Sequence, residues 1–332
     1  MEHLSLYHSE LPPVLAALAE TPAMRRLTGV GMNCGCEYTA FARFSQCVPY
    51  SRYEHSLGVG LIVWHFTHDP AQAVAGLLHD VSTPTFAHSV DFLNGDYLTQ
   101  ESTEADTRAV ILASEEMMSV LRQYGLTADE VCDYHRYPIA DNDTPRLSAD
   151  RLEYTVGNTL NYGFGDRLAV EALYNDLTVG ENEHKQPELV FRSPDKALQF
   201  AENALLCSKV YVSDEDRFSM EALARLLRSA LLRGVITHRD LMTTENAVIA
   251  KLTADPDSAA EWRRFCRYAR LRVSDRPEPE GVWYRVDAKK RYIDPLVEAR
   301  GRVTELFPAF KAKLEAFLSG RFDCWLSADA VL

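Results

Sequence analysis

The sequence contains no apolar run that could cross a lipid bilayer. Its most apolar stretch, residues 57–66, is far shorter than the roughly 20 residues that a spanning helix needs. The first residues have neither the basic segment nor the apolar core of a secretory signal. Seven cysteines, an odd number in 332 residues, do not predict a disulfide framework. We therefore expect a cytoplasmic protein with no membrane partner.

Positive charge is also scarce. The chain has 35 lysines and arginines against 48 aspartates and glutamates, a formal net charge of −13. Sequence-independent binding of nucleic acid needs a broad basic surface, so this balance argues against a nucleic-acid partner. It leaves room for a local basic pocket that takes a small phosphorylated molecule, and a bound cation would offset the negative charge there.

The hydrophobic pattern is helical almost throughout, so the sequence predicts an all-α fold. Residues 70–80 are apolar nearly all round, which is typical of a core helix. Val282, Tyr284 and Val286 alternate with other residues and predict at most a short β-hairpin near 282–293. Further helices are expected over residues 11–20, 54–67, 102–124, 127–135, 146–160, 167–175, 195–211, 218–232, 238–253, 258–269 and 300–318.

Four residues on three expected helices are candidate metal ligands: His55, His79, Asp80 and Asp150. Imidazole nitrogens and carboxylate oxygens suit a borderline-to-hard divalent ion. A His-Asp dipeptide alone has little meaning, and His68-Asp69 is a second one in this chain. The evidence that singles out 79–80 is therefore its surroundings.

Those surroundings resemble the HD superfamily of metal-dependent phosphohydrolases, and in particular its deoxynucleoside triphosphate triphosphohydrolase branch. The resemblance is carried by SRYEHSLGVG at 51–60, AGLLHDVSTPTFAHSVD at 75–91, and DRLEY at 150–154. PAMRRL at 22–27, LLRGVITHRDLM at 231–242 and KKRYIDPLV at 289–297 are similar to further family segments. The resemblance implies an HD-domain helical core with the metal site in residues 1–165. A C-terminal helical lobe, 166–332, would pack on that core.

The resemblance also implies a chemistry. His55, His79, Asp80 and Asp150 would hold a divalent ion, which could be Zn, Fe, Mn, Ni, Co or Mg. The enzyme would hydrolyse a phosphoric ester or anhydride of a nucleotide, with a deoxynucleoside triphosphate as one candidate. Many relatives are oligomers, so a homo-oligomer is a further expectation.

The same resemblance gives roles to residues around the metal. Arg52 would neutralise phosphate oxygens, because a guanidinium can bind them in bidentate fashion. His88, oriented by Asp91, would act as general acid or stabilise the transition state. The substrate pocket would be lined by Arg151, Tyr154 and Asn158.

Each role has a structural alternative. Arg52 could pair with Glu54 or Glu153, His88 could cap a helix, and Tyr154 could be a core residue. His135 could be an extra ligand of a two-metal site, although a surface histidine is the simpler interpretation. A metal cluster of Cys34, Cys36 and Cys47 is disfavoured, because it lacks a fourth nearby ligand.

Three positions depart from the family pattern. Thr83, Gln100 and Ser213 stand where the family has histidines. None of these side chains can donate a proton as imidazolium does near neutral pH. The substrate therefore stays open among a deoxynucleoside triphosphate, a nucleoside monophosphate, a cyclic nucleotide and an alarmone. A catalytically weak nucleotide sensor is the alternative from another class.

Overall fold

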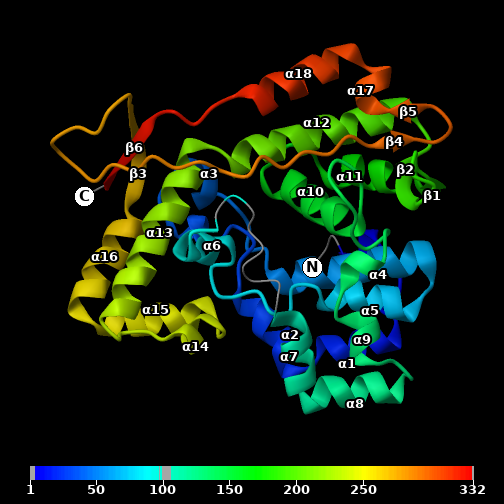
Figure 1. Cartoon of the computed structure of the whole chain (residues 1–332), viewed down its shortest axis with the longest axis horizontal. Coiled ribbons are helices and arrows are strands. Elements are labelled where there is room, and N and C mark those ends of the chain that lie inside the picture. Colours follow the sequence, from blue (N-terminus) through cyan, green and yellow to red (C-terminus); the bar gives the residue numbers. More distant parts are fainter. Residues whose placement is uncertain (1–3, 97, 99–105, 331–332) are drawn as a thin grey trace.

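Helices dominate the computed structural model, which describes residues 4–96, 98 and 106–330 (Figure 1). The expected all-α class is confirmed, with two small sheets added. The α-helices of the described residues are α1 (Pro13–Ala19), α2 (Pro22–Arg26), α3 (Ala42–Ser45), α4 (Arg52–Thr67), α5 (Pro70–Leu78), α6 (His88–Asn94), α7 (Thr107–Ala113), α8 (Glu115–Gln123), α9 (Ala128–Val131), α10 (Ala149–Asn161), α11 (Arg167–Tyr174), α12 (Pro194–Tyr211), α13 (Asp214–Leu232), α14 (His238–Leu241), α15 (Glu245–Ala254), α16 (Pro256–Cys266), α17 (Val303–Leu306) and α18 (Pro308–Ser319).

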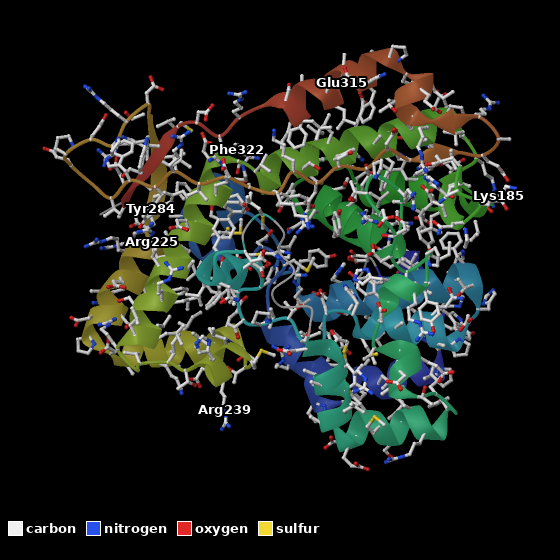
Figure 2. The ribbon with its side chains drawn as sticks, in the orientation of Figure 1. Lys185, Arg225, Arg239, Tyr284, Glu315 and Phe322 are labelled. Carbon is white, nitrogen blue, oxygen red and sulfur yellow. The ribbon has the colours of Figure 1, made fainter. Side chains whose placement is uncertain are left out.

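The two sheets lie at opposite ends of the molecule. One has the strand order β1-β2-β4-β5 and the other pairs β3 with β6. Figure 2 shows Lys185, in the turn between β1 and β2, far from Tyr284, which forms an isolated bridge with Leu326 of β6. The strands are β1 (Leu177–Glu181), β2 (Pro187–Phe191), β3 (Tyr268–Ser274), β4 (Leu296–Val297), β5 (Gly301–Arg302) and β6 (Trp325–Ala330).

Some expected elements are broken or displaced. The predicted helix 102–124 begins outside the described residues, and Ser114 then divides the rest by accepting the amide of Met117 at 3.2 Å to start α8. Thr244 divides 238–253 in the same way. The predicted strand near 282–293 is wrong except for the bridge at Tyr284, because most of that segment has no partner strand.

Other predicted bounds also shift. Residues 127–135 form the short α9 and the beginning of a 3-10 turn at Tyr134–Arg136. Residues 300–318 contain α17 and α18, which Phe307 separates. Helix α10 begins at Ala149 and not near Arg146, because Ser148 is its N-cap and accepts the amide of Arg151 at 3.3 Å.

Two clusters of buried apolar side chains hold the helices together. One joins α1, α4, α5, α10 and α12, and the other packs α6 against α13, α15 and α16. The expected division of the chain after residue 165 stays a prediction. No helix in the described part of the chain combines the length and apolar character that a membrane crossing requires.

Helices α4 and α5 pack against each other in the first cluster. Candidate ligands lie at the start of α4 and directly after α5. Ser51 and Glu54 form a capping box that starts α4, and Asp69 caps α5. The two helices approach closely at glycines: a Cβ at Gly60 would lie 3.1 Å from the Cβ of Leu77. This approach brings the start of α4 beside the end of α5.

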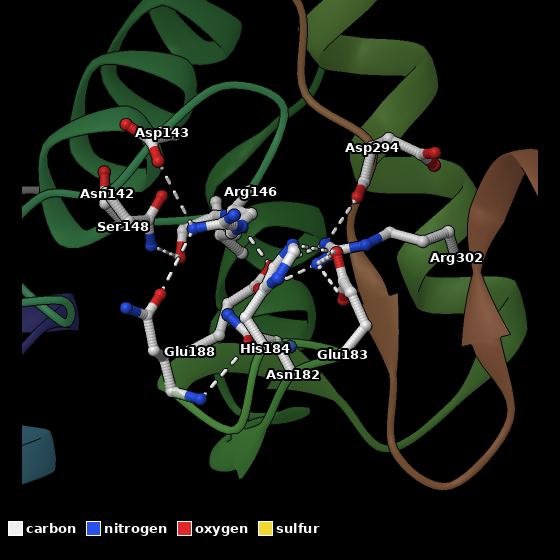
Figure 3. Close-up of polar contacts among 12 residues, drawn as sticks. Asn142, Asp143, Arg146, Ser148, Asn182, Glu183, His184, Glu188, Asp294 and Arg302 are labelled. Atoms are coloured by element: carbon white, nitrogen blue, oxygen red, sulfur yellow. Dashed lines mark hydrogen bonds and ion pairs between the residues drawn. The ribbon is translucent and has the colours of Figure 1, made fainter.

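A buried ion pair fixes the chain that leads into α10 (Figure 3). The guanidinium of Arg302 donates to both carboxylate oxygens of Glu188, at 2.7 and 2.8 Å, and to the carbonyl oxygen of Asp294 at 3.0 Å. Glu188 also accepts the amide of Leu147 at 3.1 Å, two residues before α10. The C-terminal segment thus holds the start of the helix that carries Asp150.

We predict that Arg302→Met lowers the free energy of unfolding by about 3 kcal/mol, because it leaves the carboxylate of Glu188 buried without its cation. Urea denaturation followed by circular dichroism measures the change. Arg300→Met, on the exposed neighbour, is the control and should change stability little. Adding Glu188→Leu to Arg302→Met should recover part of the loss. An unchanged unfolding midpoint in Arg302→Met would contradict the assignment.

Candidate metal centre

The four predicted metal ligands meet at one point, although they come from three distant segments. His55 lies in the first turn of α4, His79 and Asp80 directly follow α5, and Asp150 lies in the first turn of α10. The Nε2 atoms of His55 and His79 are 3.2 Å apart. Oδ1 of Asp150 lies 3.1 Å from Nε2 of His55 and 3.8 Å from that of His79. Oδ2 of Asp80 lies 3.8 and 3.6 Å from the same nitrogens.

The hydrogen bonds of the two imidazoles leave their Nε2 atoms facing the cluster. Nδ1 of His79 donates to the carbonyl oxygen of Gly76 at 2.7 Å, since a carbonyl can only accept. Nδ1 of His55 is 2.6 Å from Oε2 of Glu153. A neutral imidazole that donates through Nδ1 carries its lone pair on Nε2, which is the arrangement of a metal-binding histidine. The donor set therefore fits a divalent cation.

The electrostatic environment also favours positive charge at this point. Burial opposes a charge on His55, but hydrogen bonds to Asp150 and Glu153 outweigh that penalty and raise the pKa of His55 to about 10. The same contacts lower the pKa of Asp150 against the opposing effect of burial. Within the described residues, His55, His79 and Asp80 are the one group whose ligand atoms all lie within 4.8 Å of one another.

Glu153 is a functional candidate that we did not expect beyond a possible partner for Arg52. Its carboxylate is fully buried and accepts hydrogen bonds from His55, from the hydroxyl of Tyr50 and, at 3.4 Å, from the hydroxyl of Tyr7. Gly58 leaves room for it, since a Cβ there would lie 2.6 Å from Cγ of Glu153. The sequence signal is its position three residues after Asp150, on the same face of α10.

Arg52 pairs with neither Glu54 nor Glu153. Its Nη1 donates to Oδ2 of Asp80 at 2.8 Å, and Oδ1 of Asp80 accepts the hydroxyl of Thr83 at 2.8 Å. Burial opposes the charge on Asp80, but Arg52 and the histidines hold the pKa of its carboxyl well below its usual range. Thr83 thus orients a candidate metal ligand. Phosphate binding by Arg52 stays a prediction.

A cavity opens beside the cluster and collects most of the predicted substrate residues. Tyr154 and Asn158 line it, and each follows Asp150 on one face of α10. Burial raises the pKa of Tyr154 to about 12, so its hydroxyl keeps its proton. The amide of Asn158 donates to the hydroxyl of Tyr211 at 2.8 Å. The lining also includes Arg52, His55, His79, Asp80, His88 and Asp150.

His88 faces this cavity from the start of α6. Its Nδ1 lies 2.9 Å from Oδ2 of the buried Asp91, as predicted. Its Nε2 is 3.4 Å from Nη2 of Arg291, which can only donate. Burial lowers the pKa of His88, and Arg291 and Arg52 lower it further against the pull of Asp91. The imidazole is thus held between Asp91 at Nδ1 and Arg291 at Nε2.

Arg151 and His135 lie outside the lining. Nη1 of Arg151 donates to Asn142 at 2.9 Å and lies 3.2 Å from Oδ1 of Asp141, so its role in substrate binding stays a prediction. His135 pairs with the other oxygen of Asp141 at 2.7 Å.

The remaining residues that the sequence singled out do not gather at one place. Cys34 lines the cavity, whereas Cys36 and Cys47 do not. Ser213 caps α13, and Gln100 lies outside the described residues.

Two cationic residues of the lining were missed. Lys289 and Arg291 reach the cavity from the irregular segment that precedes β4. The basic run at 289–291 is visible in the sequence. Nothing in its local pattern indicates that this segment reaches a cavity beside α4, α5 and α10. Together with Arg52 they give the lining three cationic side chains.

Comparison with known proteins adds a distant relationship. No protein-family model matches the chain. It is 26% identical over 309 residues to the metal-dependent phosphohydrolase cns2 of Cordyceps militaris, a match that covers 89% of this chain and 84% of cns2. It is 27% identical over 242 residues to the uncharacterized protein YdhJ of Bacillus subtilis, which covers 73% of this chain and 71% of YdhJ. The cns2 match is too long to fall within either half of the chain.

We predict that Glu153→Gln weakens binding of Mn²⁺ or Co²⁺ by about 10- to 100-fold, because an amide is a poorer acceptor for Nδ1–H of His55 than a carboxylate is. Isothermal titration calorimetry on metal-free protein measures the affinity. The matched control is Glu298→Gln, a change at an exposed glutamate. Equal affinities in Glu153→Gln and the control would show that Glu153 does not support the site.

Proposed function

We propose that this chain is a metal-dependent phosphohydrolase of the HD superfamily type that acts on a nucleotide. The observation that carries the proposal is the convergence of His55, His79, Asp80 and Asp150 with both Nε2 atoms facing the cluster. The distant similarity to cns2, which is named a metal-dependent phosphohydrolase, supports the same activity.

These four side chains would hold the ion, and the candidates are Zn, Fe, Mn, Ni, Co and Mg. When bound, a divalent ion supplies an activated water near neutral pH and offsets charge on the phosphoryl group. Glu153 and Gly76 would keep the two imidazoles in the tautomer that binds metal. Asp80 would be held by Arg52 and Thr83.

The cationic residues of the cavity lining are suited to bind the phosphate of the substrate. Arg52, Lys289 and Arg291 all line it. A guanidinium presents parallel N–H groups that match two phosphate oxygens, and such charge-assisted hydrogen bonds are among the stronger ones in proteins. Arg52 is already fixed by Asp80, so it would bind phosphate without losing further side-chain freedom.

His88 would move a proton at its Nε2. Without substrate, burial and then the charges of Arg291 and Arg52 lower the pKa of His88 and favour the neutral imidazole. A phosphate dianion beside it would neutralise those charges and favour the imidazolium, with Asp91 holding Nδ1–H. The imidazolium could then donate from Nε2 to the leaving oxygen of the ester.

The substrate class rests on the remaining lining. Tyr154, Asn158 and Tyr211 would contact the nucleoside part. Thr83 is engaged with Asp80, and so it does not supply the acid that the family has at this position. Release of triphosphate is therefore one candidate reaction beside hydrolysis of a nucleoside monophosphate, a cyclic nucleotide or an alarmone.

A panel of nucleotides tests the activity. Protein loaded in turn with Mn²⁺, Co²⁺, Ni²⁺, Zn²⁺, Fe²⁺ and Mg²⁺ should release phosphate, pyrophosphate or triphosphate from at least one of them. Asp150→Ala should lose both the bound metal, by elemental analysis, and the activity, because it removes a ligand. If no nucleotide is hydrolysed but one raises the melting temperature, a nucleotide sensor is the correct function.

We predict that His88→Gln lowers kcat by about 100-fold while metal content stays at the wild-type level, because the proton donor is lost and the ligands are not. His238→Gln, at an exposed histidine on α14, is the matched control. A parallel loss of metal and activity in His88→Gln would instead assign His88 to the structure of the centre.

A further inference from the structure

The cavity has a second polar region that the proposed reaction does not use. The candidate ligands come from α4, the end of α5 and α10, whereas Asp216 enters from α13, which Figure 1 shows apart from α4 and α5. Ser213 is the N-cap of this helix, and its Oγ accepts the backbone amide of Asp216 at 3.3 Å. This bond fixes the position of Asp216 in the first turn of α13.

The carboxyl group of Asp216 lacks a strong donor. Oδ1 faces Sγ of Cys36 at 3.9 Å, a weak contact, and Oδ2 is buried with no hydrogen-bond partner among the described residues. Burial raises the pKa of Asp216 well above its usual range, although Cys36, Arg217 and Arg291 act in the opposite direction. A buried polar oxygen without a donor is costly and calls for a partner, which a bound ligand can provide.

A second acceptor lies in the same lining. Oδ1 of Asn158, a residue that is 5% exposed, also has no partner among the described residues, because the interaction with Tyr211 uses the amide nitrogen. Oδ1 of Asn33 is already taken by the hydroxyl of Tyr162 at 3.0 Å. The cavity lining thus offers both cationic donors and unused acceptor oxygens.

Apolar and aromatic side chains of the lining accompany Asp216, although the charges of Arg217 and Arg291 also act on it. Met220 lies one turn further along α13 and is buried, and Met32, Tyr162 and Tyr211 complete the lining there. Aromatic rings and thioethers pack well against a planar ring, whereas a sugar would need more polar partners. The most suitable ligand group is therefore a planar ring with an N–H donor at its edge.

We propose that Asp216 accepts a hydrogen bond from the exocyclic amino group of a nucleobase and so selects amino-bearing bases such as adenine, guanine or cytosine. Asn158 accepts a second donor from the same nucleoside. This inference rests on the proposed function, since it places the phosphate against Arg52, Lys289 and Arg291 and the base against α13.

Matched nucleosides test the selection without requiring hydrolysis. Calorimetric titration of the full-length, Mn²⁺-loaded protein compares adenosine with purine riboside, guanosine with inosine, and cytidine with uridine. In at least one pair the amino-bearing member should bind about tenfold tighter or more, because its partner leaves a buried acceptor unsatisfied. No preference in any pair, or no binding of any nucleoside, overturns the proposal.

Two substitutions assign the preference to the side chain. Asp216→Leu should abolish the difference within the preferred pair. Asp216→Asn keeps one acceptor oxygen but replaces the other by an N–H donor. It should therefore narrow the preference within the pair, because it can also bind a carbonyl oxygen of an amino-free member such as uridine, which a purely structural role would not do. Glu215→Gln, one residue earlier on α13 and outside the lining, is the control and should keep the wild-type preference. A preference that persists in Asp216→Leu contradicts the assignment.

The phosphorylated forms of the same pair separate the two proposals. If wild-type protein prefers the amino-bearing nucleoside but hydrolyses none of its phosphates with any metal, the hydrolase proposal fails and the base site stands. If both nucleotides are hydrolysed with equal kcat/KM, the hydrolase stands and selection by Asp216 fails. If Asp216→Leu loses activity on both nucleotides to the same extent, Asp216 contacts the sugar or supports the packing of α13. This result would also overturn selection of the base.

Discussion

The buried carboxylate of Glu153 joins the parts of the site. A charge enclosed in a core must have donors, and Glu153 takes them from Tyr7, near the start of the chain, and from Tyr50 and His55, around the start of α4. Gly58 and Gly157 leave the space: a Cβ at Gly157 would lie 2.5 Å from the hydroxyl of Tyr50. The packing of α4 on α10 and the orientation of His55 are therefore one structural requirement, and neither can change without exposing an unsatisfied charge.

The convergence of the four residues was predicted from the resemblance of their motifs to the HD superfamily, while local pattern placed each of them at a helix end. His79 and Asp80 follow an apolar helix, and Asp150 lies one residue inside a helix that Ser148 caps. The contacts of the residues around these ligands could not be foreseen. Arg151 turns to Asp141, and Arg291 arrives from an irregular segment, since both outcomes depend on tertiary packing and not on local pattern.

The same contrast holds for the fold. Helix positions followed from apolar periodicity and from capping residues, and the errors fall where a Ser or Thr cap interrupts a continuous pattern, as at Ser114 and Thr244. Alternation near 282–293 predicted strands that the structure does not form, because a strand needs a partner and only Tyr284 has one there. β1 and β2 were missed although an Asn-containing polar turn separates two runs with β-branched residues.

The distribution of charge around the cavity connects Thr83 with residues of the C-terminal half. Thr83 gives no charge to the phosphate side, yet Lys289 and Arg291 bring two cations to the lining from more than 200 residues further along the chain. A substrate anion would therefore be bound mainly by residues outside the motif that holds the metal. Because Asp216 also comes from that half, the N-terminal segments would set the chemistry of the site, while the C-terminal segments would set which molecules reach it.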